Sequence, residues 1–337
     1  MDFPPRLSLA RRPTPFYLLE RLSATLGGPR IWIKRDDLTE AAAGGNKIRK
    51  LEYVLARARA AGCDALVTSG GIQSNHCRAT ALACARLGLE CHLILRGQQE
   101  GAPDGNLLLD HLAGATFSFY PREVYSTRKP EIVAELIEHY ARQGKKAYWI
   151  PVGASNAIGS WGYIRAYQEM MHQVEKSNWP NRRIDHIVTA VGSGGTLAGL
   201  IAGRALFGGK NAPRIWGVNV CDDAEYFKTE VRGILEELNE KFNLGLTERA
   251  TPIEIFDGYV GEGYAIPYPE EIEAIKQAAR EEGQILDPVY TGKAFYGLTQ
   301  EILKGRFKTT DNVVFLHTGG MFGLFPQREQ FGFGESD

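Results

Sequence analysis

A lysine at the start of a predicted helix, just after two glycines, is the residue of this chain most suited to catalysis by its position. Lys47 follows Gly44-Gly45 and lies in the first turn of a predicted helix that ends near Gly62. Apolar residues at steps of three and four predict the buried face of this helix: Ile48, Leu51, Leu55 and Ala58. The positive end of a helix dipole disfavours an ammonium, and a neutral amine condenses with aldehydes. Lys47 is therefore a candidate for imine chemistry; the alternative is an ordinary solvated lysine.

Other cations near Lys47 would lower its pKa further. Four basic side chains lie close to it in the sequence: Lys34, Arg35, Arg49 and Lys50. If the fold brings them near Lys47, their charges disfavour a second ammonium at this place. The sequence thus predicts a lysine with a lowered pKa and attributes the shift to the helix dipole and to these neighbours.

A glycine-rich turn between a predicted strand and a predicted helix is the second candidate site. The turn consists of Gly192, Ser193, Gly194, Gly195 and Thr196. Amides and hydroxyls at a helix N-terminus converge on an anion, so this turn predicts a phosphate-binding cup. It is not a dinucleotide fingerprint, because Leu197 stands where the third glycine is required. The alternative is a tight connection without a ligand.

Polar side chains also crowd a second strand-to-helix turn. Ser74, Asn75 and His76 follow the glycines at 70–71. Short polar groups and amides there could hold a substrate carboxylate, with Ser74 facing the reacting carbon; the alternative is that Ser74 or Asn75 only caps the helix. Two further segments, residues 287–293 and 317–320, end apolar stretches, where open α/β sheets place their ligands.

Short apolar strands alternate with helices along most of the chain. The predicted strands cover residues 31–35, 65–68, 91–95, 116–119, 147–150, 186–190, 215–220 and 313–317. The predicted helices cover residues 47–62, 74–87, 106–112, 130–143, 157–174, 270–282 and 294–304, with one more from residue 196. This alternation predicts the α/β class, with two doubly wound, mainly parallel sheet domains and a ligand cleft between them.

Composition excludes several classes of function. The 337 residues suffice for two domains, and 39 basic against 40 acidic residues give a net charge of -1, which favours neither nucleic acid nor membrane as a partner. The sequence shows no signal-peptide pattern and no run of 18 apolar residues, so we expect a cytoplasmic protein. Five cysteines without a C-x-x-C pair indicate reduced thiols and no metal site.

Together these motifs resemble those of a known family. Gly-Gly-Asn-Lys behind an Arg-Asp-Asp turn, the segment 73–76, the 192–196 cup and Asp-Pro-Val-Tyr at 287–290 occur in this order. They are similar to fold type II pyridoxal phosphate enzymes, specifically the 1-aminocyclopropane-1-carboxylate (ACC) deaminase and D-cysteine desulfhydrase family. The resemblance runs from about Phe3 to Phe325.

The resemblance implies a tryptophan synthase β-like fold with pyridoxal 5'-phosphate in the cleft between two domains. The large, cofactor-binding domain would comprise residues 1–50 and 161–337, and the small domain residues 51–160. The family also implies a homodimer and a small amino acid as substrate.

The resemblance further assigns roles to single residues. Lys47 would form the imine with the cofactor and shuttle the substrate α-proton. Asn75 would bind the phenolate oxygen of the cofactor, the 192–196 cup its phosphate, and Ser74 would lie beside the substrate. The other implied site residues are His76 and Tyr264 at the substrate, Tyr290 as a second active-site tyrosine, and Thr291 and Thr318 at the cofactor.

Two positions favour the desulfhydrase branch. Deaminases of the family carry a glutamate, facing the pyridine nitrogen, where this chain has Thr291, and a leucine where it has Thr318. A glutamate keeps the pyridine protonated and thus a strong electron sink, which opening a cyclopropane ring demands. A threonine offers only a neutral hydrogen bond, and expelling a thiol needs less of the sink.

We therefore expect α,β-elimination of D-cysteine to pyruvate, ammonia and hydrogen sulfide. The alternatives within this chemistry are L-cysteate sulfo-lysis, elimination from D-serine or β-chloroalanine and, least favoured, ACC deamination. A cation such as Arg78 or Lys293 lining the pocket would favour the sulfonate of cysteate. Rivals of other classes are a nucleotide-binding protein that uses Lys47 as a counter-ion, and a catalytically idle cofactor-binding homologue.

Overall fold

The computed structural model describes residues 2–177, 179, 182–247 and 250–333, which form two sheets. The larger sheet contains β1 (Phe16–Leu18), β2 (Arg30–Arg35), β7 (His186–Val191), β8 (Arg214–Asn219), β9 (Glu254–Phe256) and β10 (Asn312–His317). The smaller sheet contains β3 (Ala65–Gly71), β4 (Glu90–Arg96), β5 (Thr116–Tyr120) and β6 (Ala147–Ile150). Their orders are β1-β2-β10-β7-β8-β9 and β5-β4-β3-β6, and all neighbours are parallel except β1 and β2.

Helices follow most of the strands. They are α1 (Glu20–Leu26), α2 (Asn46–Ala60), α3 (Asn75–Leu87), α4 (Gly105–Leu112), α5 (Arg122–Arg142), α6 (Ala157–Glu175), α7 (Gly195–Phe207), α8 (Ala224–Phe242), α9 (Pro269–Glu282), α10 (Thr291–Leu303) and α11 (Met321–Leu324). The predicted α/β class with two mainly parallel sheets is confirmed. Each predicted strand is present, and so is each predicted helix.

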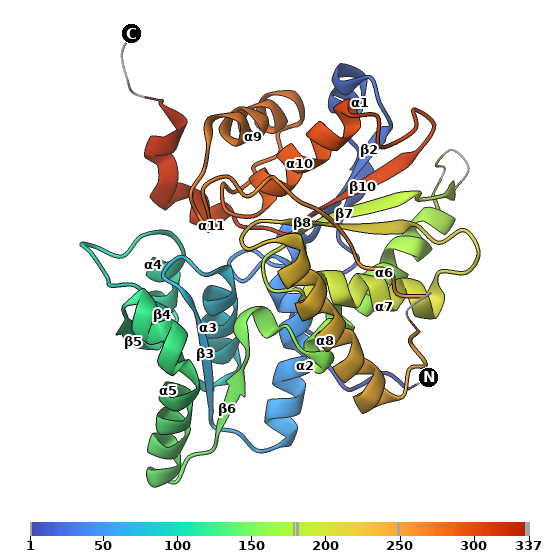
Figure 1. The fold of residues 1–337 in the computed structure, drawn as a ribbon. Coiled ribbons are helices and arrows are strands. Elements are labelled where there is room, and N and C mark those ends of the chain that lie inside the picture. The colour runs from blue at the N-terminus through green and yellow to red at the C-terminus, as the bar shows by residue number, and fades with distance from the viewer. Residues whose placement is uncertain (1, 178, 180–181, 248–249, 334–337) are drawn as a thin grey trace.

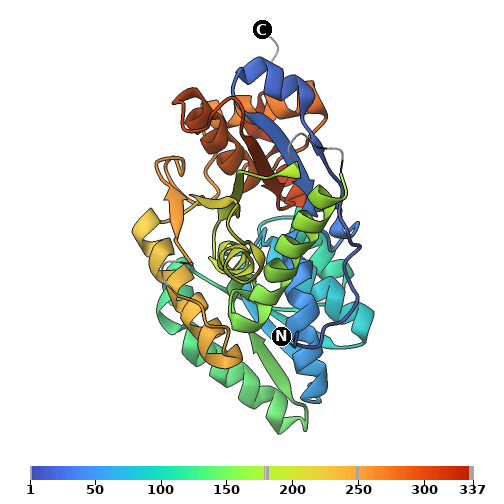
Figure 2. The ribbon, with the colours of Figure 1, turned by 90° about the vertical axis from the view of Figure 1, so that its right-hand side faces the viewer.

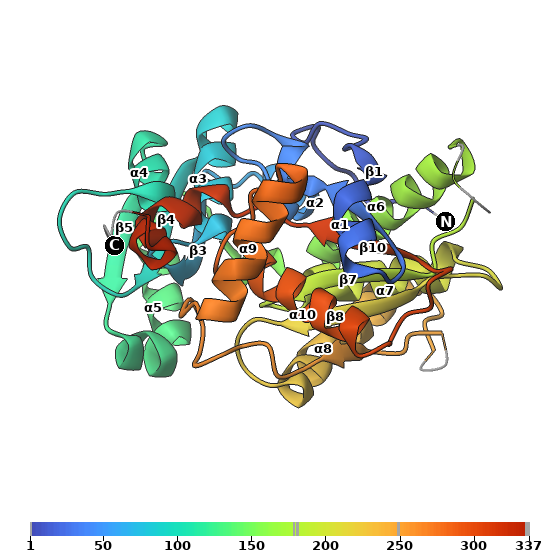
Figure 3. The same ribbon diagram turned by 90° about the horizontal axis from the view of Figure 1, so that it is seen from above.

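Helices cover both faces of the larger sheet. α1, α9 and α10 lie on one face and α6, α7 and α8 on the other (Figures 1 and 3). Side chains along β2 alternate accordingly: Ile31 and Ile33 pack in the core beneath α1 and α10, whereas Trp32 packs in the core around α2, α6 and α7. The two sheets lie at opposite ends of the molecule, with α1 beyond the larger and α5 beyond the smaller (Figure 2).

The structure contains five helices and strands that the sequence analysis did not predict: β1, α1, α8, β9 and α11. α5 begins at Arg122, before the predicted start at residue 130, so that Pro130 lies inside the helix. The longest of the unpredicted elements is α8. Its N-terminus is capped by Asp223, whose Oδ1 accepts a hydrogen bond from the amide of Tyr226 at 2.7 Å, and its buried residues follow helical spacing.

The predicted domain boundaries at residues 50 and 160 stay a prediction. The strands between residues 65 and 150 form the smaller sheet, and all other strands belong to the larger. Among the described helices, none is both long and apolar enough to span a membrane. Within the same residues, no group of three or more histidines, cysteines or carboxylates is arranged to hold a metal ion.

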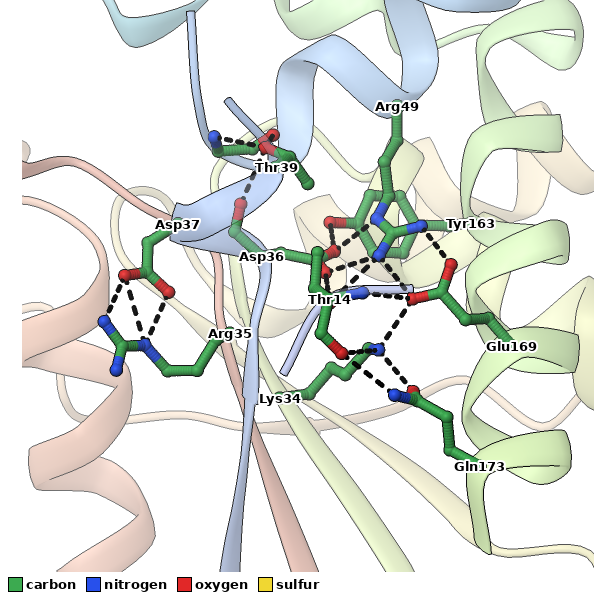
Figure 4. A network of polar contacts seen from close by, with 11 residues as sticks. Thr14, Lys34, Arg35, Asp36, Asp37, Thr39, Arg49, Tyr163, Glu169 and Gln173 are labelled. Atoms are coloured by element: carbon green, nitrogen blue, oxygen red, sulfur yellow. Dashed lines mark hydrogen bonds and ion pairs between the residues drawn. The ribbon is translucent and has the colours of Figure 1, made fainter. Parts of the chain in front are cut away.

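A buried network of ion pairs joins β2, α2 and α6 (Figure 4). Arg49 of α2 donates to both carboxylate oxygens of Asp36 at 2.7 and 2.8 Å and to both of Glu169 at 2.9 Å. Lys34 of β2 donates to Glu169 at 2.6 Å, and the hydroxyl of Tyr163 donates to Asp36 at 2.6 Å. Each carboxylate thus has several charged or polar donors, which a buried charge requires.

We expect the variant Arg49→Met to lose about 3–5 kcal/mol of unfolding free energy, because it leaves the carboxylates of Asp36 and Glu169 buried without their main partner. Denaturant unfolding of the purified protein measures this loss. The control is Arg142→Met, which removes an exposed pair with Glu138 and should cost less than about 0.5 kcal/mol. Equal midpoints for the two variants would contradict the structural role of Arg49.

The network should also make stability depend on acid pH. Burial alone would raise the pKa of Glu169, but hydrogen bonds and charges of Arg49 and Lys34 outweigh it and lower this pKa to about 2. A lowered carboxylate pKa stabilises the fold above the ordinary value of 4.5, and this contribution is lost as pH falls towards 2. Glu169→Gln lacks the charge at every pH. The stability difference between the wild type and this variant should therefore narrow from pH 4.5 to 2 in unfolding experiments.

Candidate active site

A cavity of about 650 Å³ lies between the two sheets, where residues at the carboxyl ends of their strands face each other. It is lined by the segments that follow β3, β4 and β6 of the smaller sheet and β7, β8 and β10 of the larger. The predicted site residues that line it are Lys47, Ser74, Asn75, His76, Gly192, Ser193, Gly194, Thr196, Tyr264, Tyr290 and Thr318. Gly195 and Thr291 do not line it. The fold thus brings together side chains from distant parts of the chain.

The start of α2 holds Lys47 at the cavity. The amide of Asn46 donates to the carbonyl of Thr318 at 2.9 Å, and its side-chain amide donates to the hydroxyl of Thr196 at 3.0 Å. Gly45 precedes it with φ of +117°, and a Cβ at this place would lie 2.9 Å from the Thr318 carbonyl oxygen. A side chain at residue 45 would therefore push α2 away from the cavity.

Lys47 carries the pKa shift that imine chemistry needs. Burial lowers the pKa of Lys47 to about 8; the charge of Asp287 opposes this, and that of Arg78 lowers the pKa further. The side chain remains partly accessible through the cavity, which it lines. A fraction of the amine is therefore neutral near pH 7. The direction of the shift agrees with the prediction.

Three of the four neighbouring cations, Lys34, Arg35 and Arg49, do not lower the pKa of Lys47 as the sequence analysis considered. Lys34 and Arg49 bind the carboxylates of the buried network described above, and Arg35 pairs with Asp37 at 2.6 Å. Because these charges are neutralised locally, they do not act on Lys47. Removal from water and the guanidinium of Arg78 lower its pKa instead.

The 192–196 turn forms a cup at the N-terminus of α7. Gly194 adopts φ of +76°, a conformation that favours glycine, and Ser193 accepts a hydrogen bond from the hydroxyl of Ser155 at 2.9 Å. The amide of Gly195 donates to the Ser155 hydroxyl at 3.2 Å, and Gly195 does not line the cavity. Its predicted contact with the phosphate therefore has no support from its position. The other four residues of the cup line the cavity and could hold an anion.

The sequence analysis named Lys50 only as a cation near Lys47 and assigned no role to Ser155. The amine of Lys50 is buried and donates to the Ser155 hydroxyl at 3.4 Å, directly behind the cup. Burial, and then the charge of Lys47, lower the pKa of Lys50 well below its usual value. The spacing of three residues from Lys47 was the available signal, because residues three apart share one face of a helix.

Ser74 and Asn75 begin α3 at the cavity. The Ser74 hydroxyl accepts a hydrogen bond from the amide of Cys77 at 3.2 Å, so Ser74 is the N-cap and also lines the cavity. Asn75 Oδ1 accepts from Arg78 at 3.0 Å. Ser74 can therefore cap the helix and also contact a substrate, because a hydroxyl that accepts a hydrogen bond still has a hydrogen to donate.

His76 presents an unpaired nitrogen. Its Nε2 lies 2.8 Å from the hydroxyl of Thr68, which itself donates to the carbonyl of Ile150 at 2.8 Å. This hydrogen-bond network assigns the proton to Nε2 and leaves Nδ1 as an acceptor. Nδ1 is buried and has no partner among the described residues. Burial, with the charges of Lys47 and Lys50, lowers the pKa of His76 well below its usual value, so the ring is neutral.

Two tyrosines meet on the far wall of the cavity. The hydroxyls of Tyr264 and Tyr290 lie 2.5 Å apart, and Lys47 Nζ lies 5.9 Å from the ring centroid of Tyr290. Burial raises the pKa of Tyr264 to about 12, although its hydrogen bond with Tyr290 opposes the rise. Burial, and then the neighbouring Tyr264, raise the pKa of Tyr290 well above its usual value. Both phenols therefore keep their protons near neutral pH and can donate them.

Thr291 lies behind the wall of the cavity, so its predicted contact with the cofactor has no support from its position. Its hydroxyl donates to Asp287 Oδ1 at 2.7 Å and accepts from the amide of Asp287 at 2.8 Å. The side chain is buried in this pair and does not reach the cavity. The reason is local, because Asp287 caps the helix that Thr291 begins. Thr318, by contrast, lines the cavity.

The predicted pocket cations are also different ones. Arg78 is buried and donates to Asn75, Asn106 and the carbonyl of Gly44, and Lys293 is buried behind the wall of the cavity. The cation that lines the cavity beside the tyrosines is Arg96, at the end of β4. Its guanidinium carbon lies 5.4 Å from the ring centroid of Tyr264. Arg122 and Lys129 line the outer part.

The cavity fits a phosphorylated aldehyde. The cup offers amides and hydroxyls to a phosphate, with the buried amine of Lys50 behind it. Lys47 lines the same cavity and supplies an amine of lowered pKa, which can condense with an aldehyde.

Comparison with known proteins identifies the family. Residues 7–319 match the family described as pyridoxal-phosphate dependent enzyme. The chain is 41% identical to a protein of Arabidopsis thaliana named bifunctional D-cysteine desulfhydrase/1-aminocyclopropane-1-carboxylate deaminase, mitochondrial, over 96% of this chain and 80% of that protein. It is 45% identical to a putative 1-aminocyclopropane-1-carboxylate deaminase of Thermotoga maritima, over 96% and 98% of the two chains.

A solved structure described as an ACC deaminase homologue has the same fold. The superposition gives a TM-score of 0.88 at 36% identity and covers 98% of this chain and 96% of the other. The family match and the relatives extend over nearly the whole chain, including every motif of the cavity. The chain therefore belongs to the pyridoxal-phosphate dependent enzymes, in the group of ACC deaminases and D-cysteine desulfhydrases, and its cofactor is pyridoxal 5'-phosphate.

Proposed function

We propose that the protein catalyses α,β-elimination of D-cysteine to pyruvate, ammonia and hydrogen sulfide. The observation that carries the proposal is the pair of threonines at positions 291 and 318, where deaminases of the family carry glutamate and leucine. Thr318 lines the cavity, and the Thr291 hydroxyl is bound to Asp287, so neither position supplies the carboxylate that a strong electron sink needs. The name of the Arabidopsis relative includes this activity beside deamination.

The proposal assigns different steps of the reaction to different residues. When bound, pyridoxal phosphate supplies an aldehyde for amines and an electron sink for charge that develops at the α-carbon. Lys47, partly neutral near pH 7, accepts the α-proton at Nζ. Tyr264 or Tyr290, each protonated, donates to the leaving sulfur or steers it, and Ser74 is a third candidate for this role.

The same proposal assigns the binding groups. The 192–194 backbone, Ser193 and Thr196 would hold the phosphate, and the buried amine of Lys50 lies behind them. Asn75 would bind the phenolate oxygen of the cofactor, and His76 and the start of α3, which line the cavity, would contact the substrate. A homodimer and a cytoplasmic location stay predictions; the name of the Arabidopsis relative places that protein in mitochondria.

Removing Lys47 should abolish turnover, because the imine and the proton transfer both depend on its amine. We expect Lys47→Ala to lower D-cysteine elimination by roughly 10³-fold or more, measured as pyruvate and sulfide release. Borohydride reduction of the wild-type holoenzyme should attach the cofactor to the peptide that contains Lys47, and mass spectrometry detects it. Lys241→Ala, at an exposed lysine of α8, is the control and should keep full activity. Unchanged turnover in Lys47→Ala would refute the proposal.

Sulfo-lysis of L-cysteate is a second candidate, and the position of Arg96 favours it. A guanidinium beside Tyr264 can bind an anionic group on the β-carbon of the substrate. The wild type and Arg96→Met should be assayed with D-cysteine, L-cysteate and ACC for sulfide, sulfite and 2-oxobutanoate. If D-cysteine is the substrate, the wild type releases sulfide and Arg96→Met changes its kcat/KM by less than about tenfold. Sulfite release that Arg96→Met abolishes would assign the enzyme to cysteate instead.

A further inference from the structure

Lys293 is a buried lysine that neither touches the cavity nor pairs closely with a carboxylate among the described residues. It lies in the first turn of α10. Its ammonium donates to three backbone carbonyls, those of Val260 at 2.6 Å, Gly263 at 2.7 Å and Ile266 at 3.0 Å. All three belong to one loop, residues 257–268, which we call the tyrosine loop because it carries Tyr264 into the cavity. An ammonium has three hydrogens, so all three donors of Lys293 bind carbonyls of this loop.

The three acceptors surround the catalytic tyrosine of the loop. Gly263 precedes Tyr264, and Ile266 follows it by two residues. Ala265, between them, has φ of +60°, a left-handed conformation that a non-glycine residue rarely adopts. Such a conformation persists only where surrounding contacts stabilise it. The hydrogen bonds from Lys293 to the carbonyls of Gly263 and Ile266, on either side of Ala265, stabilise it here.

The same helix start also carries the second tyrosine. Tyr290 lies three residues before Lys293, and its hydroxyl meets that of Tyr264 at 2.5 Å. The N-terminal end of α10 therefore contacts the tyrosine loop twice, through the Tyr290 hydroxyl in the cavity and through the Lys293 ammonium behind it. Two separate contacts to one rigid element determine both the position and the orientation of the loop.

A buried carboxyl group lies near the Lys293 side chain. Glu271 of α9 is fully buried, and neither of its oxygens has a hydrogen-bond partner among the described residues. It lies against the start of α10, because a Cβ on Gly292 would come within 2.8 Å of its Oε1. Burial lowers the pKa of Lys293, and the charge of Glu271 opposes this; burial likewise raises the pKa of Glu271 to about 8, and the charge of Lys293 opposes that. The three carbonyls of the tyrosine loop are therefore the close partners of Lys293.

We propose that Lys293 is a positioning residue of the elimination reaction, which holds the Tyr264 hydroxyl in place against Tyr290 through the backbone of the tyrosine loop. The inference rests on the proposed function, in which these tyrosines assist departure of the leaving group. Lys293 itself does not contact the substrate. Its removal should therefore impair reactions that need help for the leaving group and spare those that do not.

The test compares two substrates in the holoenzyme of Lys293→Met, which removes all three hydrogen bonds at similar volume. D-cysteine expels sulfur, which needs a proton, whereas β-chloro-D-alanine expels chloride, which needs none. We expect kcat/KM for D-cysteine to fall roughly tenfold or more and that for β-chloro-D-alanine to fall less than about threefold. An equal fall for both substrates would indicate general damage and overturn the proposal.

A double-mutant cycle with Tyr264→Phe tests whether Lys293 acts through this tyrosine. If it does, Lys293→Met should have little further effect on D-cysteine turnover in the Tyr264→Phe background. If the fold-loss of the double variant equals the product of the two single losses, the two residues act independently, which would contradict the inference. Lys304→Met is the control, because Lys304 lies at the end of the same helix and binds the side-chain hydroxyl of Tyr259, not the loop backbone. It should leave both substrates unaffected.

Amide hydrogen exchange tests the hold on the loop without any substrate. Lys293→Met should increase exchange in residues 258–267 and leave that of β7 and β8 unchanged. Lys293→Gln, with two donor hydrogens on a side chain one atom shorter, should give an intermediate increase and replaces Lys293→Met if that variant does not fold. Unchanged exchange in the loop would overturn the proposal whatever the substrate. A wild type that is inactive on D-cysteine but shows the exchange effect would refute only the proposed function.

Discussion

The double ion pair of Arg49 is the interaction on which the position of Lys47 depends. Arg49 binds Asp36, which follows β2, and Glu169 of α6, and it lies only two residues after Lys47 on α2. Because these carboxylates are buried, α2 cannot slide or rotate without leaving a charge unpaired. The hydrogen bonds of Asn46 to Thr196 and Thr318 anchor the same helix from the cavity side. Together they place Lys47 where the strand ends of the two sheets face each other.

Removal from water then tunes the reactive groups in opposite directions. It lowers the pKa of Lys47 and raises the pKa of Tyr264 and Tyr290, because in each case the charged form is the disfavoured one. The result is a cavity with a partly neutral amine as proton acceptor and two neutral phenols as proton donors. One physical cause, burial at the cavity, thus suits both the proton acceptor and the proton donors of the proposed elimination.

The start of α10 organises the opposite wall. Asp287 accepts hydrogen bonds from the amides of Val289, Tyr290 and Thr291 and from the Thr291 hydroxyl, so the turn before the helix is rigid. This rigidity aims Tyr290 at the cavity and Lys293 at the tyrosine loop. It also explains why Thr291 is not available to the cofactor. The difference from the deaminases at position 291 matters because the glutamate carboxylate is missing. The threonine hydroxyl, which is bound to Asp287, does not take over its contact with the cofactor.

Local patterns in the sequence determined much of this protein. Periodicity predicted most of the strands and helices, and short motifs that occupy one turn each indicated Lys47, Ser74 and the 192–196 cup, because their function depends on neighbours in the chain. Only the tertiary structure decided the partners. Lys50 meets Ser155 across 105 residues, Arg49 meets Glu169 across 120, and Lys293 meets Gly263 across 30. No local pattern encodes such contacts. The sequence analysis therefore considered Arg49 as a cation acting on Lys47 and Lys293 as a cation lining the pocket. Packing between distant elements gives both residues a different role.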